Sequence, residues 1–238
     1  MCCKGRKKYV FFSVTLQGNR GNSMKRLSIP FIQELGSLSI EEVHALLDER
    51  GARIPIEEIN WPAFTYRPLT TVCLARSEDF IHILFQVHGN CLRAVHSNDN
   101  EPVHQDSCVE FFVKRADSND YFNFEFNCIG TCKAAKHHGN RENAEDLSLN
   151  ELSTIERSPS LGRRAFNEMS GIFSWELDVR IPFALIDVEP SLLPPTLLGN
   201  FYKCADATEQ PHYVSWSPIK TERPDFHRPE FFGELRLD

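Results

Sequence analysis

The sequence QDSCVEFFVKRADSNDYFNFEFNCIG, residues 105–130, contains two segments in which apolar residues occupy every second position. This period is typical of β-strands, and the Asp-, Asn- and Ser-rich residues 114–120 between the segments are typical of a hairpin loop. An antiparallel register that pairs residue 113 with residue 122 brings the alternating apolar side chains onto one face, and a slip of one residue would destroy this match. These side chains are Val109, Phe111, Val113, Phe122, Phe124 and Phe126.

The opposite face of the predicted hairpin carries polar residues. The same register places Glu110 directly across from Glu125 and Cys108 across from Asn127, and opposed side chains have Cβ atoms roughly 4.5–5.5 Å apart. Because like charges at this distance are destabilising, a cation from another strand, a metal, a shared proton or a polar ligand must offset the pair. A solvated sheet face would also tolerate carboxylates, but together with Asn123 they form a dense patch of hydrogen-bonding groups. We therefore predict that the function resides on this face.

The composition restricts the fold and the partners. With 238 residues, 41% of them hydrophobic and 18 of them Phe, the chain can bury a large core, and β-sandwiches of this size commonly form one domain. A net charge of −7 argues against nucleic acid and anionic membranes as main partners. No apolar run reaches the roughly 18 residues that a membrane helix needs. The eight Cys show no close-spaced framework, so we expect mostly free thiols. The oligomeric state stays open.

Residues 1–23 differ from the rest of the chain. Several basic residues precede a short apolar run, YVFFSV, in an arrangement that resembles a secretory signal. The run is short, however, and no A-x-A cleavage site follows it. We interpret residues 1–23 as a disordered tail, or as the product of a start codon placed too early with Met24 as the true start. Residues 24–238 are then expected to form a single domain, and the sequence alone favours a cytoplasmic protein.

From Met24 onward, short strands recur at the spacing of a sandwich. Ser39-Ile-Glu-Glu42 is a capping box, and the apolar stripe that follows it, closed by Gly51, predicts one short N-terminal helix. Trp175 and Trp216 are expected in the core, and the weak polar pattern of residues 133–171 predicts long loops. Besides the hairpin, the predicted strands are 27–32 (at an edge, because it contains Pro30), 70–75, 80–87, 91–96, 173–181, 197–204, 212–216 and 233–237.

The signals for catalysis are weak. Asp106 and Glu110 would lie roughly 13 Å apart along one strand, which exceeds the roughly 5–9.5 Å between the carboxylates of glycosidases. Glu110 and Glu125 would be close enough, but opposed carboxylates on a sheet do not flank a bond across a cleft. The chain has no G-x-S-x-G, Walker or H-E-x-x-H motif. His137-His138 could bind a metal, although adjacent His residues in a polar loop are usually solvated. We therefore predict no catalytic residues.

Several segments resemble carbohydrate-binding module family 9. Asp106-Ser-Cys-Val-Glu-Phe-Phe-Val113 is similar to the D-S-V-E signature of that family, with Cys108 as an extra residue. The resemblance continues through 121–130, 175–183 and 199–207, and ends in Ser215-Trp216 and in 226–237, which resembles the closing strand of the family. The motifs occur in the right order over most of residues 60–237. Family 9 modules are β-sandwiches, commonly stabilised by calcium, that bind sugar chain ends as accessory domains of glycan-degrading enzymes.

The resemblance implies a set of ligand-binding positions. Glu110 and Asn127 match ligand-binding residues of the family in type, whereas Glu125 stands where the family has Arg and therefore reverses a charge. Lys203 lies near a ligand-binding Gln, and Arg223 lies where an Asn contacts sugar. The family clamps a disaccharide between two Trp rings; Phe226 takes one of these positions, and Val103 or its neighbour His104 takes the other. Cations at Lys203, Arg93 and Arg223 could restore the charge balance.

We predict an all-β, jelly-roll-like sandwich of antiparallel strands with one short N-terminal helix. Its expected function is non-catalytic binding of an oligosaccharide or polysaccharide, accessory to glycan breakdown, and by family analogy the protein would be periplasmic or secreted. The expected binding residues are Glu110, Glu125, Asn127, Arg93, Lys203, Phe226 and Arg223. Calcium is a possible cofactor, with Asp106, Asp117 and Asp120 among the candidate ligands.

Three alternatives stay open. The first is a haem-binding sandwich of the type found in some cytochrome domains, with axial ligands drawn from Met169 and the His residues at 96, 104, 137 and 138. The second is a glycosidase that uses Glu110 and Glu125. The third is a structural or partner-binding sandwich with no small ligand, or a glycoside hydrolase-associated protein with weak or no sugar binding.

Overall fold

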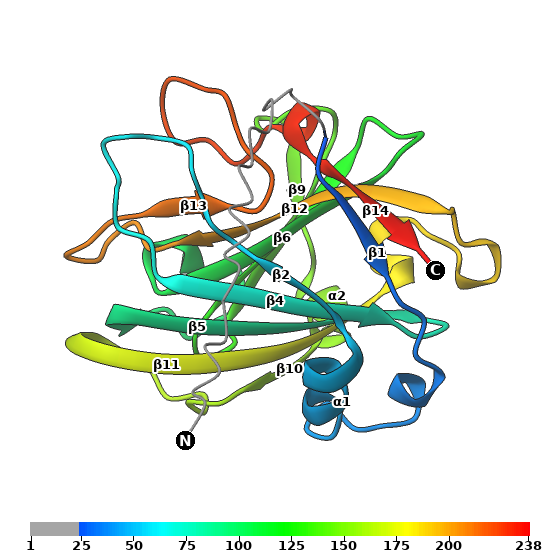
Figure 1. The fold of residues 1–238 in the computed structure, drawn as a ribbon, viewed down its shortest axis with the longest axis horizontal. Helices are drawn as coiled ribbons and strands as arrows, with labels where there is room; N and C mark the ends of the chain where they lie inside the picture. The colour runs from blue at the N-terminus through cyan, green and yellow to red at the C-terminus, as the bar shows by residue number, and fades with distance from the viewer. Residues whose placement is uncertain (1–23) are drawn as a thin grey trace, which may run out of the picture.

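The computed structural model describes residues 24–238, which form two β-sheets packed face to face (Figure 1). The prediction made for residues 1–23 lies outside the described part. The first sheet has the strand order β1-β14-β12-β6-β7-β8-β9, with β13 pairing to β12 and β3 pairing to β13. The second sheet has the order β10-β11-β5-β4-β2. The predicted all-β sandwich is therefore confirmed.

The first sheet contains β1 (Arg26–Ile29), β3 (Glu58–Ile59), β6 (Cys108–Arg115), β7 (Tyr121–Asn127), β8 (Cys132–His137), β9 (Ala144–Asp146), β12 (Thr196–Cys204), β13 (Tyr213–Ser215) and β14 (Gly233–Leu237). The second contains β2 (Ala52–Pro55), β4 (Leu69–Arg76), β5 (Phe80–Ala94), β10 (Glu156–Pro159) and β11 (Phe166–Pro182). The helices are α1 (Val43–Arg50) and α2 (Leu149–Ser153), and short 3-10 turns occupy Gln33–Gly36, Val103–Gln105, Phe183–Ile186, Pro190–Leu192 and Pro229–Phe231.

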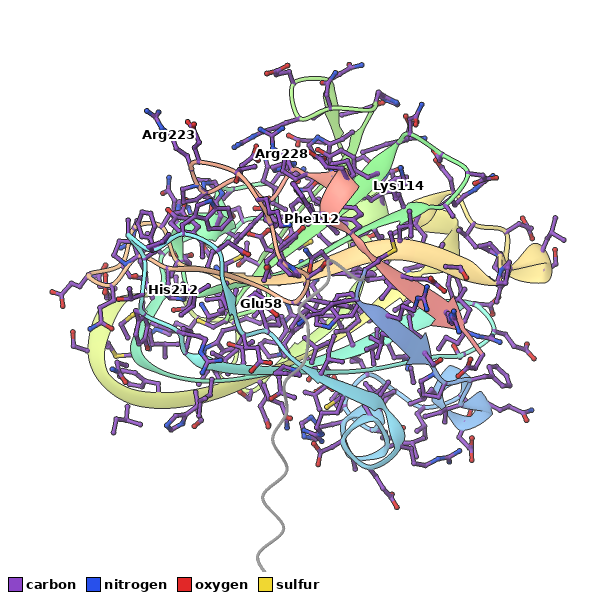
Figure 2. The ribbon with its side chains drawn as sticks, turned by 45° about the horizontal axis from the view of Figure 1, so that its top comes forward. Glu58, Phe112, Lys114, His212, Arg223 and Arg228 are labelled. Atoms are coloured by element: carbon purple, nitrogen blue, oxygen red, sulfur yellow. The ribbon has the colours of Figure 1, made fainter. Side chains whose placement is uncertain are left out.

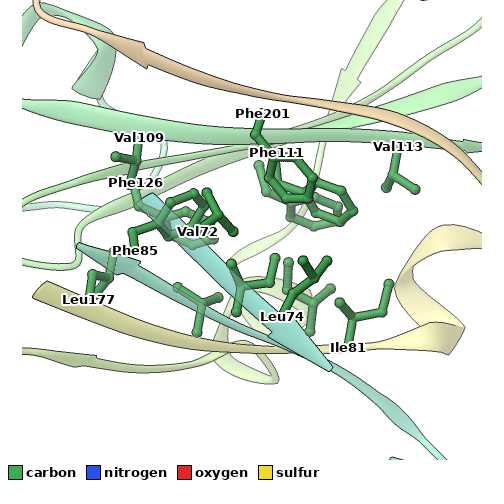
Figure 3. Packing of buried hydrophobic residues seen from close by; sticks show 14 of the residues in the cluster. Val72, Leu74, Ile81, Phe85, Val109, Phe111, Val113, Phe126, Leu177 and Phe201 are labelled. Carbon is green, nitrogen blue, oxygen red and sulfur yellow. The ribbon is translucent and has the colours of Figure 1, made fainter. Parts of the chain in front are cut away.

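The central hairpin has the register that the sequence predicts. Val113 pairs with Phe122, Phe111 with Phe124, and Glu110 with Glu125. The apolar face of β6 and β7 points into the space between the sheets, where it meets side chains of β4, β5 and β11 (Figure 3). Phe111 also stacks on Phe201 of β12, with ring centroids 4.8 Å apart. Burial of these apolar side chains supplies the main driving force for pairing the sheets.

The outer face of β6, β7 and β12 is covered as well, so the prediction that a solvated sheet face could explain its carboxylates is wrong. A second apolar cluster packs there, built from the sheet and from two distant segments, residues 61–64 and 219–232. Trp61 Nε1 links the two segments by donating a hydrogen bond to the Thr221 carbonyl (3.1 Å). As a result, Glu110 is only 2% and Glu125 only 6% exposed.

Helices differ from the prediction at two points. The expected N-terminal helix is present, but α1 begins at Val43, and the Ser39 amide donates to the Glu42 carboxylate in the turn before it. Residues 133–171, expected to be long loops, instead contain most of β8, then β9, α2, β10 and the start of β11. Ser148 and Glu151 form a complete capping box at α2. The pattern is weak because these elements are short, because β9 and α2 are mostly exposed, and because β8 buries mainly small or polar side chains.

The strand boundaries also differ from the predicted ones. The expected strands 80–87 and 91–96 form one long strand, β5, because pairing with β11 continues through two irregularities in register. β1 lies at the sheet edge as expected but pairs in parallel with β14, so the sheet is not wholly antiparallel.

Trp175 and Trp216 are buried, and the six cysteines in the described part are free thiols, as predicted. No helix among residues 24–238 is long and apolar enough to span a membrane.

Candidate functional site

A pocket of about 310 Å³ opens on the outer face of the first sheet, over β6, β7 and β8. Its far wall is the segment 224–227, which reaches the sheet from the covering loop between β13 and β14. The polar and aromatic side chains that line it are His104, Glu110, Asn123, Glu125, Lys133, His137, Arg141, Asp146, Cys204, Asp206, Tyr213, Asp225, Phe226 and His227.

The opposed glutamates form the floor of this pocket. Burial raises the pKa of Glu110 well above its ordinary value, and Cys204 and Glu125 raise it further. Glu125 accepts a hydrogen bond from Asn123 Nδ2 (2.9 Å), and His104 Nδ1 lies 3.6 Å from Glu125 Oε2. The Glu125 carboxylate in turn raises the pKa of His104. The raised pKa favours the neutral form of Glu110, and the nearby imidazole faces Glu125, so both reduce the repulsion expected from the sequence.

A chain of hydrogen bonds orients Glu125. His137 Nε2 bonds to Asn123 Oδ1 (2.9 Å), so the Asn123 amide directs its N–H toward Glu125. His137 stacks on Tyr121 with ring centroids 4.5 Å apart, and the Tyr121 hydroxyl bonds to His227 Nδ1 (3.0 Å). Burial lowers the pKa of His227 to about 3 and also lowers that of His137. Two neutral imidazoles thus form one side of the pocket.

The prediction that both His137 and His138 are solvated is wrong for His137. His138 is exposed and lies 3.1 Å from the Asp120 carboxylate, whereas His137, at the end of β8, is buried. The residues differ because alternation along β8 sends neighbouring side chains to opposite faces, and only the face of His137 is covered.

Phe226 supplies the apolar wall. Its ring stacks on Tyr202 (4.2 Å between centroids, 9° between planes) and is 8% exposed. Tyr202 therefore covers one face of the ring, and only the other can meet a ligand. Of the two residues proposed for the second clamp position, Val103 is fully buried, while His104 lines the pocket.

The structure brings three of the seven predicted binding residues to this pocket: Glu110, Glu125 and Phe226. Lys203 pairs with Val109 and so lies on the inner face of β12, where its Nζ donates to the Cys204 carbonyl (2.7 Å). It is also 3.0 Å from His212 Nε2. Lys203 therefore does not balance the glutamates from within the pocket.

The other three predicted residues also have partners or positions elsewhere. Asn127 donates to Asp106 (2.9 Å), and Arg93 lies 3.3 Å from the same carboxylate. Arg223 is exposed and points outward from the covering segment (Figure 2). The pocket instead receives its cations from Lys133, Arg141 and His104.

Several pocket residues were not anticipated. Lys133 pairs with Glu125 across β7 and β8, and His137 lies on the same face. Alternation from Lys133 onward would have placed both beside the glutamates if β8 had been recognised. Asp206, Asp225 and His227 come from loops, and no local sequence pattern marks them.

The candidate calcium ligands are not brought together. Asp106 precedes β6, whereas Asp117 and Asp120 follow it, so the strand separates them. Asp106 accepts bonds from the amides of Val95 and His96 (both 3.0 Å). Calcium binding stays a prediction, and these three residues do not form one site for it.

Comparisons with known proteins agree with this architecture. A sequence model of carbohydrate-binding family 9 matches residues 41–237. The solved structure of a Bacteroides uniformis protein, proposed to bind carbohydrate, is 37% identical with a TM-score of 0.85, over 91% of this chain and 100% of that one. A family 9 module from Caldicellulosiruptor kristjanssonii in complex with cellotriose has the same fold at 13% identity, with a TM-score of 0.53 over 90% of this chain and 93% of that one. Curated proteins gave no significant match. The chain therefore belongs to carbohydrate-binding family 9.

Proposed function

We propose that the pocket over β6, β7 and β8 binds the end of an oligosaccharide chain, and that the protein acts as an accessory to glycan breakdown. As a family 9 member the chain has the function of non-catalytic carbohydrate binding, which replaces the glycosidase and haem-binding alternatives. The proposal adds the place of binding and the part of the sugar that is held.

The observation that carries the proposal is an unpaired acceptor on the pocket floor. Glu125 Oε2 is buried and has no hydrogen-bond partner among the described residues. His104 Nδ1, at 3.6 Å, is within ion-pair range but too far for a hydrogen bond. A sugar hydroxyl between them can donate to the carboxylate and accept from the imidazole. Because an unsatisfied buried acceptor costs about 1–3 kcal/mol, such a ligand would remove that cost.

The size and lining of the pocket support a chain end. A volume of about 310 Å³ lies near the lower limit of small-molecule sites, which span roughly 300–1,000 Å³, and suits a short ligand. Phe226 and Tyr213 offer apolar surface beside the polar floor, a combination that matches the apolar faces and equatorial hydroxyls of a pyranose. The C. kristjanssonii module was solved with cellotriose and also with glucose (12% identity, TM-score 0.50, 90% and 96% coverage). These sugars are therefore suitable first probes.

Titration calorimetry tests the proposal with glucose, cellotriose and a panel of other short oligosaccharides. Glu125→Gln replaces an acceptor oxygen with a donor, so it is expected to weaken binding about tenfold or more, since 1.4 kcal/mol corresponds to a factor of ten. Glu49→Gln, at an exposed position of α1, which packs against β4 and β5 of the second sheet, is the matched control and is expected to bind as wild type does. Equal affinity of wild type and Glu125→Gln, or no heat with any sugar, would overturn the proposal.

A further inference from the structure

A second group of reactive side chains lies at the edge of the pocket floor. Cys108 of β6 and Cys204 of β12 are directly opposite each other, and Glu110 follows two residues along on the same face. The Cys204 Sγ lies 3.1 Å and the Cys108 Sγ 4.0 Å from Glu110 Oε1. The three potential ligand atoms all lie within 4.8 Å of one another, and no other set of three His, Cys, Asp or Glu in residues 24–238 meets this spacing.

These distances match those around a tetrahedral zinc ion. With Zn–S near 2.3 Å and Zn–O near 2.1 Å, a tetrahedral ion separates a sulfur and an oxygen ligand by about 3.6 Å. The two observed S–O distances, 3.1 and 4.0 Å, bracket this value, so shifts of roughly half an ångström would complete the geometry. Rigid strands hold all three ligands, since Cys108 and Cys204 are register partners. Only small side-chain rotations are then required.

The cluster also has an entry path and an open position. All three side chains are at most 2% exposed, but Cys204 and Glu110 line the pocket, whereas Cys108 does not. An ion held by the three side chains would have its fourth position toward the pocket, where water can bind. Zinc sites with three protein ligands and one open position are well known.

We propose that Cys108, Cys204 and Glu110 bind a thiophilic divalent cation of the Zn²⁺ type. Thiolates select zinc over calcium and magnesium, which prefer oxygen ligands. Binding would release the thiol protons and any proton on the carboxyl to solvent, because only the deprotonated groups coordinate. The nearby carboxylates Glu125 and Asp206 also line the pocket and favour a cation there.

The test uses the full chain after chelation, with a phosphine reductant to keep the opposed cysteines reduced. Co²⁺ is the probe, because cobalt–thiolate charge-transfer and tetrahedral d–d bands report the ligands directly, and competition with Zn²⁺ then gives the zinc affinity. A single equivalent is expected to bind. Cys204→Ser and Glu110→Gln are expected to weaken binding at least tenfold, and Cys204→Ser is expected to reduce the charge-transfer band.

Two controls separate this cluster from other thiols. Cys91→Ser removes a half-buried thiol of β5 outside the cluster, and Cys2→Ser/Cys3→Ser removes the two cysteines near the start of the chain. Both are expected to bind cobalt as wild type does. No cobalt–thiolate band in wild type, unchanged binding in Cys204→Ser and Glu110→Gln, or loss of binding in the Cys2/Cys3 variant would overturn the proposal. Because no sugar is present, the outcome is independent of carbohydrate binding.

Discussion

Replacement of Glu110 by Gln tests whether a proton offsets the repulsion between the opposed glutamates. Glu110 is 2% exposed and accepts a hydrogen bond from the Cys204 thiol, which a Gln carbonyl can also accept. The substitution therefore preserves shape and the thiol contact while removing the ability to ionise. If the folded protein holds Glu110 neutral, Glu110→Gln should have a weaker dependence of stability on pH than wild type.

The sign follows from proton linkage. Burial, with Cys204 and Glu125 adding to it, raises the pKa of Glu110 in the folded state well above the ordinary value of 4.5. Above that value the unfolded chain releases a proton that the folded chain keeps, so the stabilising effect is fully present at lower pH and is lost as the pH rises toward the folded-state pKa. Between the two pKa values the loss approaches about 1.4 kcal/mol of unfolding free energy per pH unit. The unfolding free energy of Glu110→Gln does not decrease with pH in this way, because Gln cannot ionise.

Urea unfolding at about pH 5, 6 and 7 measures the effect. Trp61, Trp175 and Trp216 are all buried, so their fluorescence reports unfolding. In metal-free, reduced protein, the stability of Glu110→Gln relative to wild type is expected to rise by about 1.4 kcal/mol for each pH unit between the ordinary pKa and the folded-state pKa. Glu49→Gln, at an exposed position, is expected to follow wild type. Parallel curves for wild type and Glu110→Gln would show that the buried carboxyl is ionised and refute the reasoning.

Three further predictions concern placement and packing. Lys203→Met is expected to leave sugar affinity within about twofold of wild type, because the ammonium lies on the inner face of β12; a tenfold loss in calorimetry would contradict this. Asp106→Asn is expected to lower the unfolding free energy by about 1.5–3 kcal/mol, since its buried carboxylate accepts two backbone amides; unchanged urea unfolding would argue against it. Phe201→Ala is expected to lower the unfolding free energy by about 3–5 kcal/mol in the same assay, because the buried ring stacks on Phe111. Ile172 is 78% exposed, so Ile172→Ala should change the unfolding free energy by less than about 0.5 kcal/mol.

The hairpin register could be read from the sequence because it depends on short-range alternation. A slip of one residue from the pairing of Val113 with Phe122 would turn one apolar face outward, and the structure has the predicted pairing. The same reasoning located Glu110 opposite Glu125. It did not locate β9 and α2, because they bury few side chains, or β8, because the side chains that β8 buries are mostly small or polar (Cys132, Ala134, Ala135 and His137) and give no apolar alternation.

Alternation states which residues share a face, but it does not state what covers that face. The face that carries Glu110 is covered by Trp61 and by the segment 219–232, both far away in sequence. The same coverage builds the pocket and leaves Glu125 Oε2 without a partner. The order of β12 and β6 brings Cys204 beside Cys108. Short-range alternation is thus enough to specify a sandwich, its apolar core and the polar character of one face, whereas contacts between distant segments bury this face and form the pocket.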